Sequence, residues 1–277
     1  MAQRVFSRLV EVVKALAPDH VVRTVLDVGA RDCEESRQFA LAYPEARVYA
    51  FECNPATLPR CRAMAAAEPR ISLTEKAVSN RTGTVTFYPI DQQRTVTGVA
   101  DGNPGASSLF RATGRYAEEN YVQDEIEVET LRLDEFMHAQ GIDAVDILWM
   151  DVQGAEGLVL EGLGARLRAI RFLHVEVEFF EIYRDQALFE DVDPYLRKGG
   201  FRLLGFTSYS RYAADALYVR DDIPLARQVS KSALQREFPY LARNLGKMRA
   251  HRLKRSLRRA VGLSAWPQAR NEGRAFP

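Results

Sequence analysis

The alternation of short apolar runs with helical segments constrains the fold of this chain most. Residues 22–28 form one run, which contains Asp27, and residues 47–51 form the next, which Glu52 follows directly. The residues between them, 34–43, have the pattern of a helix. Strands that alternate with helices and right-handed crossovers are typical of one parallel sheet covered by helices. We therefore predict an α/β fold.

The same alternation continues along the chain. Further strands are expected over residues 71–78, 84–88, 126–133, 146–150 and 170–177, and further helices from Pro55 to Ala67 and over residues 134–140, 155–167 and 188–198. The runs at 201–206 and 214–219 predict a closing antiparallel hairpin. The stretch between the strands 84–88 and 126–133 is rich in Gly, Asn, Ser and Asp, which predicts a long loop over one face of the sheet.

Sequence pattern and charge divide the chain into three parts. Residues 1–20 have the spacing of a helix, and residues 21–223 carry the α/β pattern. Residues 224–277 contain 13 Lys or Arg and 2 acids, a net charge of +11, and since the whole chain carries +1, residues 1–223 carry −10. The near-neutral total is therefore a sum of opposite charges, and this division predicts an acidic catalytic domain with a basic appendage.

The basic segment 224–277 also has an apolar stripe, formed by Leu241, Leu245, Met248, Leu253, Leu257 and Val261. A basic amphipathic helix of this kind suits an anionic membrane surface, an acidic protein or the acidic domain of the same chain. A solvated helix that aids packing is the alternative. Nucleic acid is an unlikely partner because aromatic residues are sparse in the segment, and the sequence leaves a homo-oligomer open.

The cysteines and the hydropathy favour a reducing compartment. Cys33, Cys53 and Cys61 form no CxxC pair and are too few for a disulfide framework. The N-terminal segment is interrupted by charges, unlike a signal peptide, and no stretch approaches the roughly 20 apolar residues that span a bilayer. We expect a cytoplasmic protein that, if it meets a membrane, lies on its inner face.

Two acidic positions near the ends of the first strands predict a ligand site. Asp27 precedes the tight turn at Gly29, and a turn at the carboxyl edge of a parallel sheet is where ligands bind. Glu52 ends the second strand, where an acid accepts hydrogen bonds from ribose hydroxyls. The dinucleotide pattern GxGxxG and the P-loop pattern are absent. The alternatives are a buried strand with its turn and an acid that begins a helix before Pro55.

Later acidic residues gather at the same predicted edge. Asp151 ends the strand 146–150, and alternation places His174, Glu176 and Glu178 on one face of the next strand. A buried structural role is expected for His174, and no Ser or Cys completes a hydrolase triad. No metal is expected, although Asp151, Glu176 and Glu178 would supply the carboxylates of a metal-dependent variant.

Several motifs together resemble the FkbM family of S-adenosylmethionine (SAM)-dependent methyltransferases over roughly residues 22–220. They are LDVGA (26–30), FECNP (51–55), KAVSNRTGTVTFY (76–88), SSL (107–109), VETLRLDEF (128–136), DILWMDVQGAEGLVLEGL (146–163) and GFRLLGF (200–206). The resemblance implies a class I, Rossmann-like methyltransferase fold with a mostly parallel sheet and a closing antiparallel hairpin, to which the basic helical extension is added.

The resemblance also assigns SAM as the cofactor and gives roles to residues. The cofactor-binding residues it implies are Asp27, Gly29 and Ala30 at the methionyl part, Glu52 with Cys53 at the ribose, Lys76, Ala77 and Val78 along the adenine, and Asp151 beside the sulfonium. The acceptor would be a small molecule, a sugar or a glycan. Ser107, Ser108, Arg111, Gln153 and Glu156 are the candidates for binding it.

The implied reaction is methylation of a hydroxyl on a sugar, glycan or secondary metabolite. The hydroxyl must lose its proton as it attacks, and Asp151 or Glu178 would take it, a contribution of about 10²–10⁴-fold. N-methylation is the alternative within the same fold. Cys33, Trp149 and Gln153 stand where the family has Gly, Lys and Glu, so a catalytically altered binding module that acts through its basic tail is a further alternative.

Overall fold

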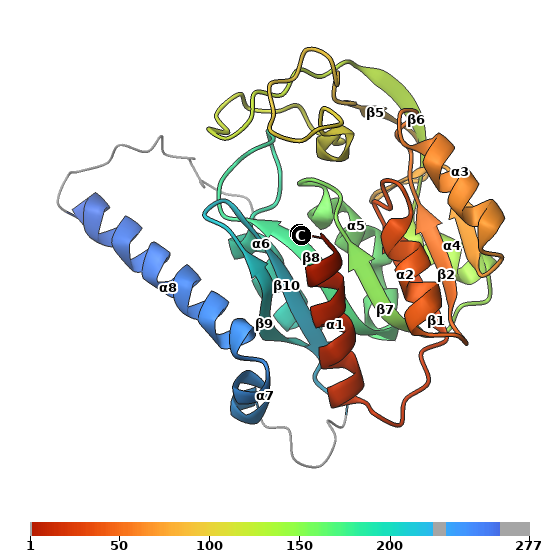
Figure 1. Ribbon diagram of the computed structural model, residues 1–277, viewed down its shortest axis with the longest axis vertical. Helices are drawn as coiled ribbons and strands as arrows, with labels where there is room; N and C mark the ends of the chain where they lie inside the picture. Colours follow the sequence, from red (N-terminus) through yellow and green to blue (C-terminus); the bar gives the residue numbers. More distant parts are fainter. Residues whose placement is uncertain (1, 224–230, 261–277) are drawn as a thin grey trace.

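A seven-stranded sheet with helices on both faces forms the centre of the computed structural model, which describes residues 2–223 and 231–260 (Figure 1). The strand order is β3-β2-β1-β7-β8-β10-β9. The strands are β1 (Thr24–Val28), β2 (Arg47–Phe51), β3 (Ile71–Thr74), β7 (Val145–Met150), β8 (Ile170–Glu178), β9 (Phe201–Tyr209) and β10 (Ala213–Arg220). Strands β3 to β8 in this order pair in parallel, and β10 pairs antiparallel with both β8 and β9. The predicted parallel sheet and closing hairpin are confirmed.

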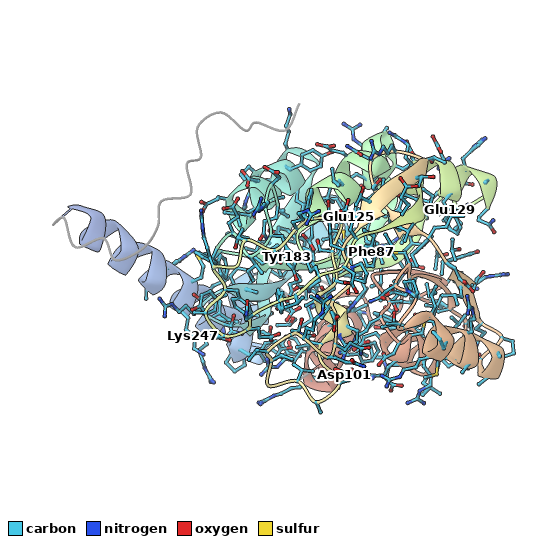
Figure 2. The ribbon with its side chains drawn as sticks, turned by 90° about the horizontal axis from the view of Figure 1, so that it is seen from above. Phe87, Asp101, Glu125, Glu129, Tyr183 and Lys247 are labelled. Carbon is cyan, nitrogen blue, oxygen red and sulfur yellow. The ribbon has the colours of Figure 1, made fainter. Side chains whose placement is uncertain are left out.

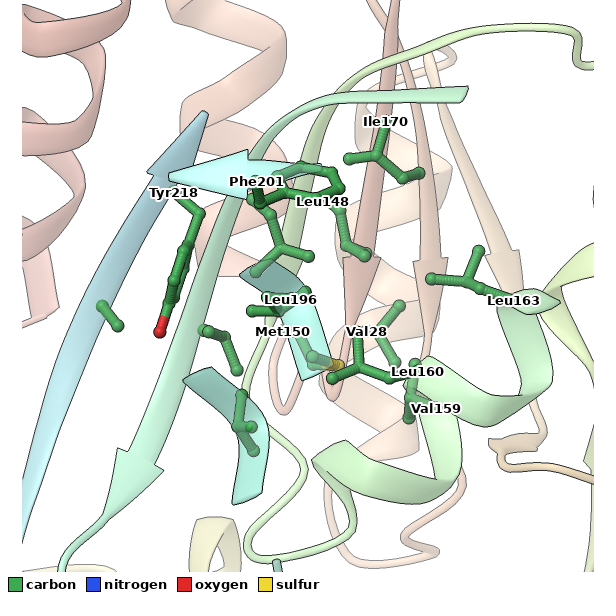
Figure 3. Close-up of a cluster of buried hydrophobic side chains, with 14 of the residues drawn as sticks. Val28, Leu148, Met150, Val159, Leu160, Leu163, Ile170, Leu196, Phe201 and Tyr218 are labelled. Atoms are coloured by element: carbon green, nitrogen blue, oxygen red, sulfur yellow. The ribbon is translucent and has the colours of Figure 1, made fainter. Parts of the chain in front are cut away.

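The helices cover two hydrophobic clusters, one on each face of this sheet. The helices are α1 (Ala2–Leu16), α2 (Glu34–Ala42), α3 (Leu58–Ala67), α4 (Leu133–Ala139), α5 (Glu156–Leu163), α6 (Phe189–Lys198), α7 (Lys231–Glu237) and α8 (Pro239–Ala260). Alternate strand residues point to opposite faces, so Leu148 and Met150 join the cluster with α5 and α6, while Ile147 and Trp149 join the cluster with α1 and α2. Figure 3 shows the first of these clusters.

A second, three-stranded sheet corrects the prediction of one strand over residues 71–78. The chain turns at Lys76, whose N–H donates to the carbonyl of Thr74 (2.9 Å), so the run divides between two sheets. Its second part is β4 (Ala77–Val78), which pairs with β6 (Ile126–Leu131), and β6 pairs with β5 (Gly83–Phe87).

The predicted helix 155–167 is also shorter than expected. It ends at Leu163, and a 3-10 helix, Gly164–Ala169, follows it. The reason is local, because Gly164 adopts a positive φ of 48°, which does not continue an α-helix.

The long loop between β5 and β6 lies over the end of the main sheet and is joined to it (Figure 1). Tyr88 pairs with Ser108 and Ile90 with Gln123 within the loop. A further bridge joins Ala112 to Tyr183, which lies beyond the end of β8. A 3-10 helix, Pro104–Ala106, lies at the centre of the long loop. The loop predicted from composition is therefore held in place by backbone pairs to its own residues and to the segment after β8.

Helices α7 and α8 pack onto the sheet edge formed by β9. Leu241, Leu245 and Met248 are buried, and the amide of Asn244 donates to the carbonyl of Phe206 (3.0 Å). The helix thereby covers the edge strand. The first part of the basic segment thus shares the core of the α/β domain. Residues 224–230 and 261–277, Val261 among them, lie outside the described residues. The domain boundary at 223/224 stays a prediction.

The exposed side of α8 carries Arg243, Lys247 and Arg249. Lys247 lies near the body of the molecule, and the helix continues beyond it (Figure 2). Within the described part of the chain, no helix has the length and apolar character needed to cross a membrane.

Candidate active site

A cleft opens at the carboxyl ends of β1, β2 and β7, where the strand order reverses direction. Such switch points are the usual ligand sites of open α/β sheets. The cleft has about 560 Å³ of space between its atoms, part of it open to solvent. Its lining includes the predicted residues Gly29, Glu52, Cys53, Lys76, Ala77, Val78, Ser107, Ser108, Asp151 and Gln153. The structure therefore brings together residues from separate motifs.

The turn after β1 brings the ends of two strands into contact. Gly29 has a φ of +84°, and a Cβ at this position would lie 1.9 Å from the carbonyl oxygen of Asp151. The N–H of Asp151 donates to the carbonyl of Val28 (3.0 Å). Only glycine combines this backbone conformation with this close approach.

Glu52 is buried at the end of β2 and organises the loops around it. Its carboxylate accepts hydrogen bonds from the backbone N–H groups of Arg31 (2.7 Å), Cys53 (2.8 Å) and Asn54 (2.6 Å). Burial raises the pKa of Glu52 to about 7, although these N–H donors oppose the rise. The carboxylate therefore titrates near neutral pH at the wall of the cleft.

Two residues, Asn54 and Arg31, join the long loop to the cleft. The Asn54 amide donates to the Pro104 carbonyl (3.1 Å) and to the Ser107 hydroxyl (3.0 Å). The Arg31 guanidinium pairs with Asp101 of the loop (2.9 Å). The sequence pattern singles out neither Arg31 nor Asn54, and only the FECNP motif, which contains Asn54, could have drawn attention to one of them.

The side of the cleft next to β4 is mostly apolar. Val78 and Phe87 line it together with Phe51 and Leu109. Figure 2 shows Phe87 near the middle of the molecule. Lys76 also lines this side, but its ammonium group pairs with Glu129 (2.6 Å). Flat apolar walls of this kind suit an aromatic ring.

Asp151 lies at the opposite side of the cleft, and Gln153 connects it to β8. The Gln153 amide donates to Asp151 Oδ1 and to Glu176 Oε2, at 2.6 Å each. Its carbonyl oxygen accepts from the hydroxyl of Tyr183 (3.0 Å). Ser108 donates to the backbone carbonyl of Gln153 (2.7 Å).

Further acids continue this side of the site. Glu176 pairs across the strands with Asp215, whose carboxylate accepts from Ser208. Burial and the charges of neighbouring acids raise the pKa of Glu176 well above its usual value and that of Asp215 to about 6. In the described part of the chain, no group of three or more His, Cys, Asp or Glu side chains is arranged to hold a metal ion.

Tyrosines of the long loop stand above these acids. The ring centroids of Tyr116 and Tyr121 are 5.8 Å apart, and Tyr121 stacks on Tyr183 at 6.1 Å. Tyr116 also meets Tyr212 edge to face at 5.1 Å. The acidic side of the site is thus covered by an aromatic wall, which local sequence patterns do not predict as a unit because its members come from distant segments.

Five predicted site residues lie outside the cleft lining. They are Asp27, Ala30, Arg111, Glu156 and Glu178. Asp27 is buried beneath the turn, accepts from Ser36 and has a pKa raised by burial to about 8. Arg111 is exposed and pairs with Glu125 instead.

Glu156 and Glu178 are each 1% exposed. Oε1 of Glu156 accepts from the N–H of Val152 (3.1 Å), and burial raises its pKa to about 8. One carboxyl oxygen of each acid has no hydrogen-bond partner. The charge of Asp151 helps to raise the pKa of both Glu156 and Glu178, so these two acids form the buried end of the acidic group.

The core accounts for His174 and for two of the three departures from the family pattern. His174 stacks on Trp149 at 4.1 Å, and its Nε2 lies 2.8 Å from the Thr207 hydroxyl. Burial lowers the pKa of His174 to about 3, so it is a neutral structural side chain. Cys33 is fully buried in the same cluster as Trp149, with a φ of 59°. Of the three departures, only Gln153 lines the cleft.

Known sequences match this chain over its catalytic part. The family described as Methyltransferase FkbM domain matches residues 27–203. The 2-O-methyltransferase NoeI of Sinorhizobium fredii (strain NBRC 101917 / NGR234) is 34% identical over 171 residues, which make up 61% of this chain and 68% of the relative.

Solved structures are more distant. Magnesium protoporphyrin IX methyltransferase from Synechocystis PCC 6803, with bound SAM, is 15% identical with a TM-score of 0.44 and covers 79% of each chain. Fibrillarin from Aeropyrum pernix, in complex with SAM, is 12% identical with a TM-score of 0.42, covering 78% of this chain and 76% of its own.

Proposed function

Because the chain belongs to the FkbM methyltransferase family, we propose that it transfers the methyl group of SAM to a hydroxyl of a sugar or glycan. The observation that carries the proposal is the cleft in which Gly29, Glu52 and Asp151 meet at the ends of three strands. The name of the relative NoeI, a 2-O-methyltransferase, supports oxygen as the accepting atom.

The residues of the cleft fit SAM in their chemistry. Glu52 offers carboxylate oxygens for ribose hydroxyls, and the apolar side at Val78 and Phe87 suits adenine. Arg31 lines the cleft, and its Nε is buried without a hydrogen-bond partner among the residues that the structure describes, so it can donate to a carboxylate such as that of a methionyl group. Asp151 lies opposite, where a carboxylate favours a sulfonium cation.

When bound, SAM supplies a methyl group on a positively charged sulfur. Asp151 is our candidate to accept the proton of the acceptor hydroxyl, because it is partly exposed in the cleft while Glu178 is buried behind it. Holding donor and acceptor at near-attack distance would supply most of the remaining rate enhancement. The cover formed by the long loop would exclude water from the reacting groups.

The aromatic wall favours a sugar as the acceptor. Tyr116, Tyr121 and Tyr212 present rings beside the acidic end of the site, and aromatic faces stack on the apolar faces of sugar rings. Ser107 and Ser108 line the cleft. The three tyrosines are therefore our candidates for acceptor binding, in place of Arg111, which faces Glu125.

The two alternatives lose support but stay distinguishable by experiment. Cys33, Trp149 and Gln153 are the residues that suggest a catalytically altered module, and the first two are core residues away from the cleft. N-methylation uses the same cofactor site and differs only in the acceptor. The products of the reaction therefore decide between oxygen and nitrogen.

The proposal is tested with purified protein, methyl-labelled SAM and a panel of neutral sugars, amino sugars and oligosaccharides. NMR of the products should show a new O-methyl group, whereas an N-methyl group on the amino sugars alone would favour the alternative. Calorimetry that detects binding of neither SAM nor its demethylated product, S-adenosylhomocysteine (SAH), would exclude the proposal.

Glu52→Gln supplies a sharper test of the cofactor site. The amide replaces a carboxylate that accepts three N–H groups, and hydrogen bonds to charged groups contribute about 1.5–3 kcal/mol each. We expect SAM affinity to fall by roughly 10–100-fold. Glu75→Gln is the matched control, since Glu75 is exposed and pairs only with Arg62.

The basic end of α8 has a separate proposed role at an anionic membrane surface. Leu241, Leu245 and Met248 are used in packing against the body, so they are not available for insertion into a bilayer. The exposed Arg243, Lys247 and Arg249 and the basic sequence that follows them favour attraction to anionic headgroups. This role would place the enzyme at the inner face of a cytoplasmic membrane, and an acidic protein is the competing partner.

A further inference from the structure

Gln153 makes more contacts at the acidic end of the site than its predicted role in acceptor binding requires. Its Nε2 donates to Asp151 Oδ1 and to Glu176 Oε2, each at 2.6 Å, so both N–H groups are used. Its Oε1 accepts from the hydroxyl of Tyr183 (3.0 Å). An amide engaged in this way has little capacity left for a substrate and instead joins two strands of the sheet.

The surroundings determine which way the amide points. If it were flipped, its oxygen would face two carboxylates and lose both hydrogen bonds. Tyr183 fits the same orientation, because its buried hydroxyl proton lies between two acceptors, Gln153 Oε1 and the Ala106 carbonyl (2.7 Å). Tyr183, from the segment after β8, thus connects Gln153 to Ala106 of the long loop. Figure 2 shows Tyr183 near the middle of the molecule.

The backbone at Gln153 is held in an uncommon conformation. Its φ is 54°, in the left-handed region that side chains other than Gly, Asn and Asp seldom adopt. Ser108 donates to its carbonyl oxygen (2.7 Å) and helps to hold the turn. Strain of this kind persists where the surrounding structure over-determines it, and it often marks functional sites.

The acids around Gln153 have no basic partner. The carboxyl groups near one another here come from β1, α2, the turn after β7, α5, β8 and β10, and the neighbouring hydroxyls come from the long loop and the segment after β8: Asp27, Glu35, Asp151, Glu156, Glu176, Glu178, Asp215, Tyr116, Tyr121 and Tyr183. Within the described residues, none of these acids forms an ion pair with Lys, Arg or His. The donors that Asp151 and Glu176 share are therefore the two N–H groups of one neutral amide.

We propose that Gln153 is a positioning residue that holds the carboxyl groups of Asp151 and Glu176 side by side next to the methyl donor. The inference rests on the proposed function and deepens it, because it names the group that directs the proton acceptor into the cleft. Hydrogen bonds to the charged form of a carboxyl favour that form. Without the amide, repulsion between neighbouring acids would keep protons on them at higher pH.

The test uses two ligands that differ at the sulfur and needs no acceptor. SAM carries a sulfonium cation, whereas SAH is neutral, so the ratio of their affinities reports negative charge beside the sulfur. Calorimetry from pH 6 to pH 9 measures this ratio for the unaltered protein and for Gln153→Met, which keeps the side-chain length and removes both N–H donors. We expect the pH at which the protein begins to prefer SAM over SAH to lie about one unit higher in the variant. At a given pH, the ratio of the two affinities would then differ by about tenfold.

Two further variants separate this role from a purely structural one. Tyr183→Phe leaves Gln153 in place and removes the hydrogen bond that orients it, so we expect a smaller shift in the same direction. Gln140→Met makes the same replacement at an exposed position between α4 and β7, and its profile should match that of the unaltered protein.

The outcomes distinguish the inference from its premise. Identical pH profiles for Gln153→Met, Tyr183→Phe and the unaltered protein, all binding both ligands, would overturn the role of Gln153. If the unaltered protein bound neither ligand, the proposed function itself would fail. If Gln153→Met does not fold, Tyr183→Phe still decides, because the near-isosteric replacement leaves the amide and its backbone in place.

Discussion

Gly29 is the residue at which the cleft tolerates least change. Glycine is required there for two reasons, a positive φ and the approach of the Asp151 carbonyl. Glu52 and Gln153 depend on the same turns, since Glu52 accepts from the loop after β1 and Gln153 belongs to the loop after β7. A single methyl group at position 29 therefore acts on both ends of the proposed cofactor site.

Gly29→Ala should destabilise the protein and weaken cofactor binding together. The added Cβ would lie 1.9 Å from the Asp151 carbonyl oxygen, which forces β1 and β7 apart at their ends. Strain and overpacking of this kind cost about 1–3 kcal/mol, and we expect SAM affinity to fall at least about tenfold. Urea unfolding and calorimetry measure the two effects.

Gly98→Ala is the control for this prediction. Gly98 lies in the long loop without a positive φ, and a methyl group added to it would meet no atom within 4 Å. Its replacement should therefore leave both measurements unchanged. Equal behaviour of the two alanine variants would contradict the role assigned to the turn.

At the scale of elements, α8 serves as the cover of an edge strand before it serves as a basic surface. Its first half packs on β9, where Gly205 allows Leu241 to approach closely. A helix laid along the last strand shields unpaired backbone groups that would otherwise pair with another chain. The first part of the apolar stripe predicted over residues 241–261 therefore packs against the sheet.

Leu241→Ala should lower the free energy of unfolding by about 2–5 kcal/mol, the usual cost of removing a buried leucine side chain. Leu241 is fully buried between α8 and β9. Lys247→Ala, on the exposed side of the same helix, should change stability by no more than about 0.5 kcal/mol. A cost for Leu241→Ala as small as that of Lys247→Ala, measured by urea unfolding, would show that α8 does not stabilise the sheet.

At the scale of the whole molecule, the opposite charges of the two parts suggest where the enzyme works. The basic segment carries +11 and the remainder −10. Because screened charges act only over about 10 Å at 0.1 M salt, we expect the basic segment to act on surfaces that lie close to it.

A chain that ends after Arg249 should separate membrane binding from folding. It lacks 7 Lys or Arg and 1 acid but keeps the buried part of α8. We expect it to keep the SAM affinity and the melting temperature of the full chain while losing sedimentation with vesicles that contain phosphatidylglycerol. Neutral phosphatidylcholine vesicles are the control, and failure of the full chain to sediment with the anionic vesicles would argue against the proposed surface.

Much of the fold could be predicted because period and turn chemistry are local properties. The hydrophobic pattern predicts the strands β1, β2, β7 and β8. Because ligands bind at the carboxyl edge of a parallel sheet, the acids at the ends of these strands are then predicted to line a site. The division of residues 71–78 between two sheets escapes such patterns, because a single backbone turn at Lys76 leaves the apolar pattern unchanged.

The site was predictable only in part, for a related reason. Residues within one motif, such as Glu52 with Cys53, lie together because they are adjacent in sequence. Motif position predicts acceptor binding for Arg111 and Glu156, yet one pairs with an exposed acid and the other is buried under the turn. Side-chain direction depends on packing partners that come from elsewhere in the chain.

The sequence by itself determined the α/β order, the family and the strand ends that carry Gly29, Glu52 and Asp151, because these depend on residue type at local spacings. Only the tertiary structure decided that Cys33 and Trp149 are core residues and that Gln153 joins Asp151 to Glu176. It also decided that the first half of the basic helix belongs to the fold. These outcomes depend on which distant segments meet, and that is set by the packing of the whole chain rather than by any one stretch of it.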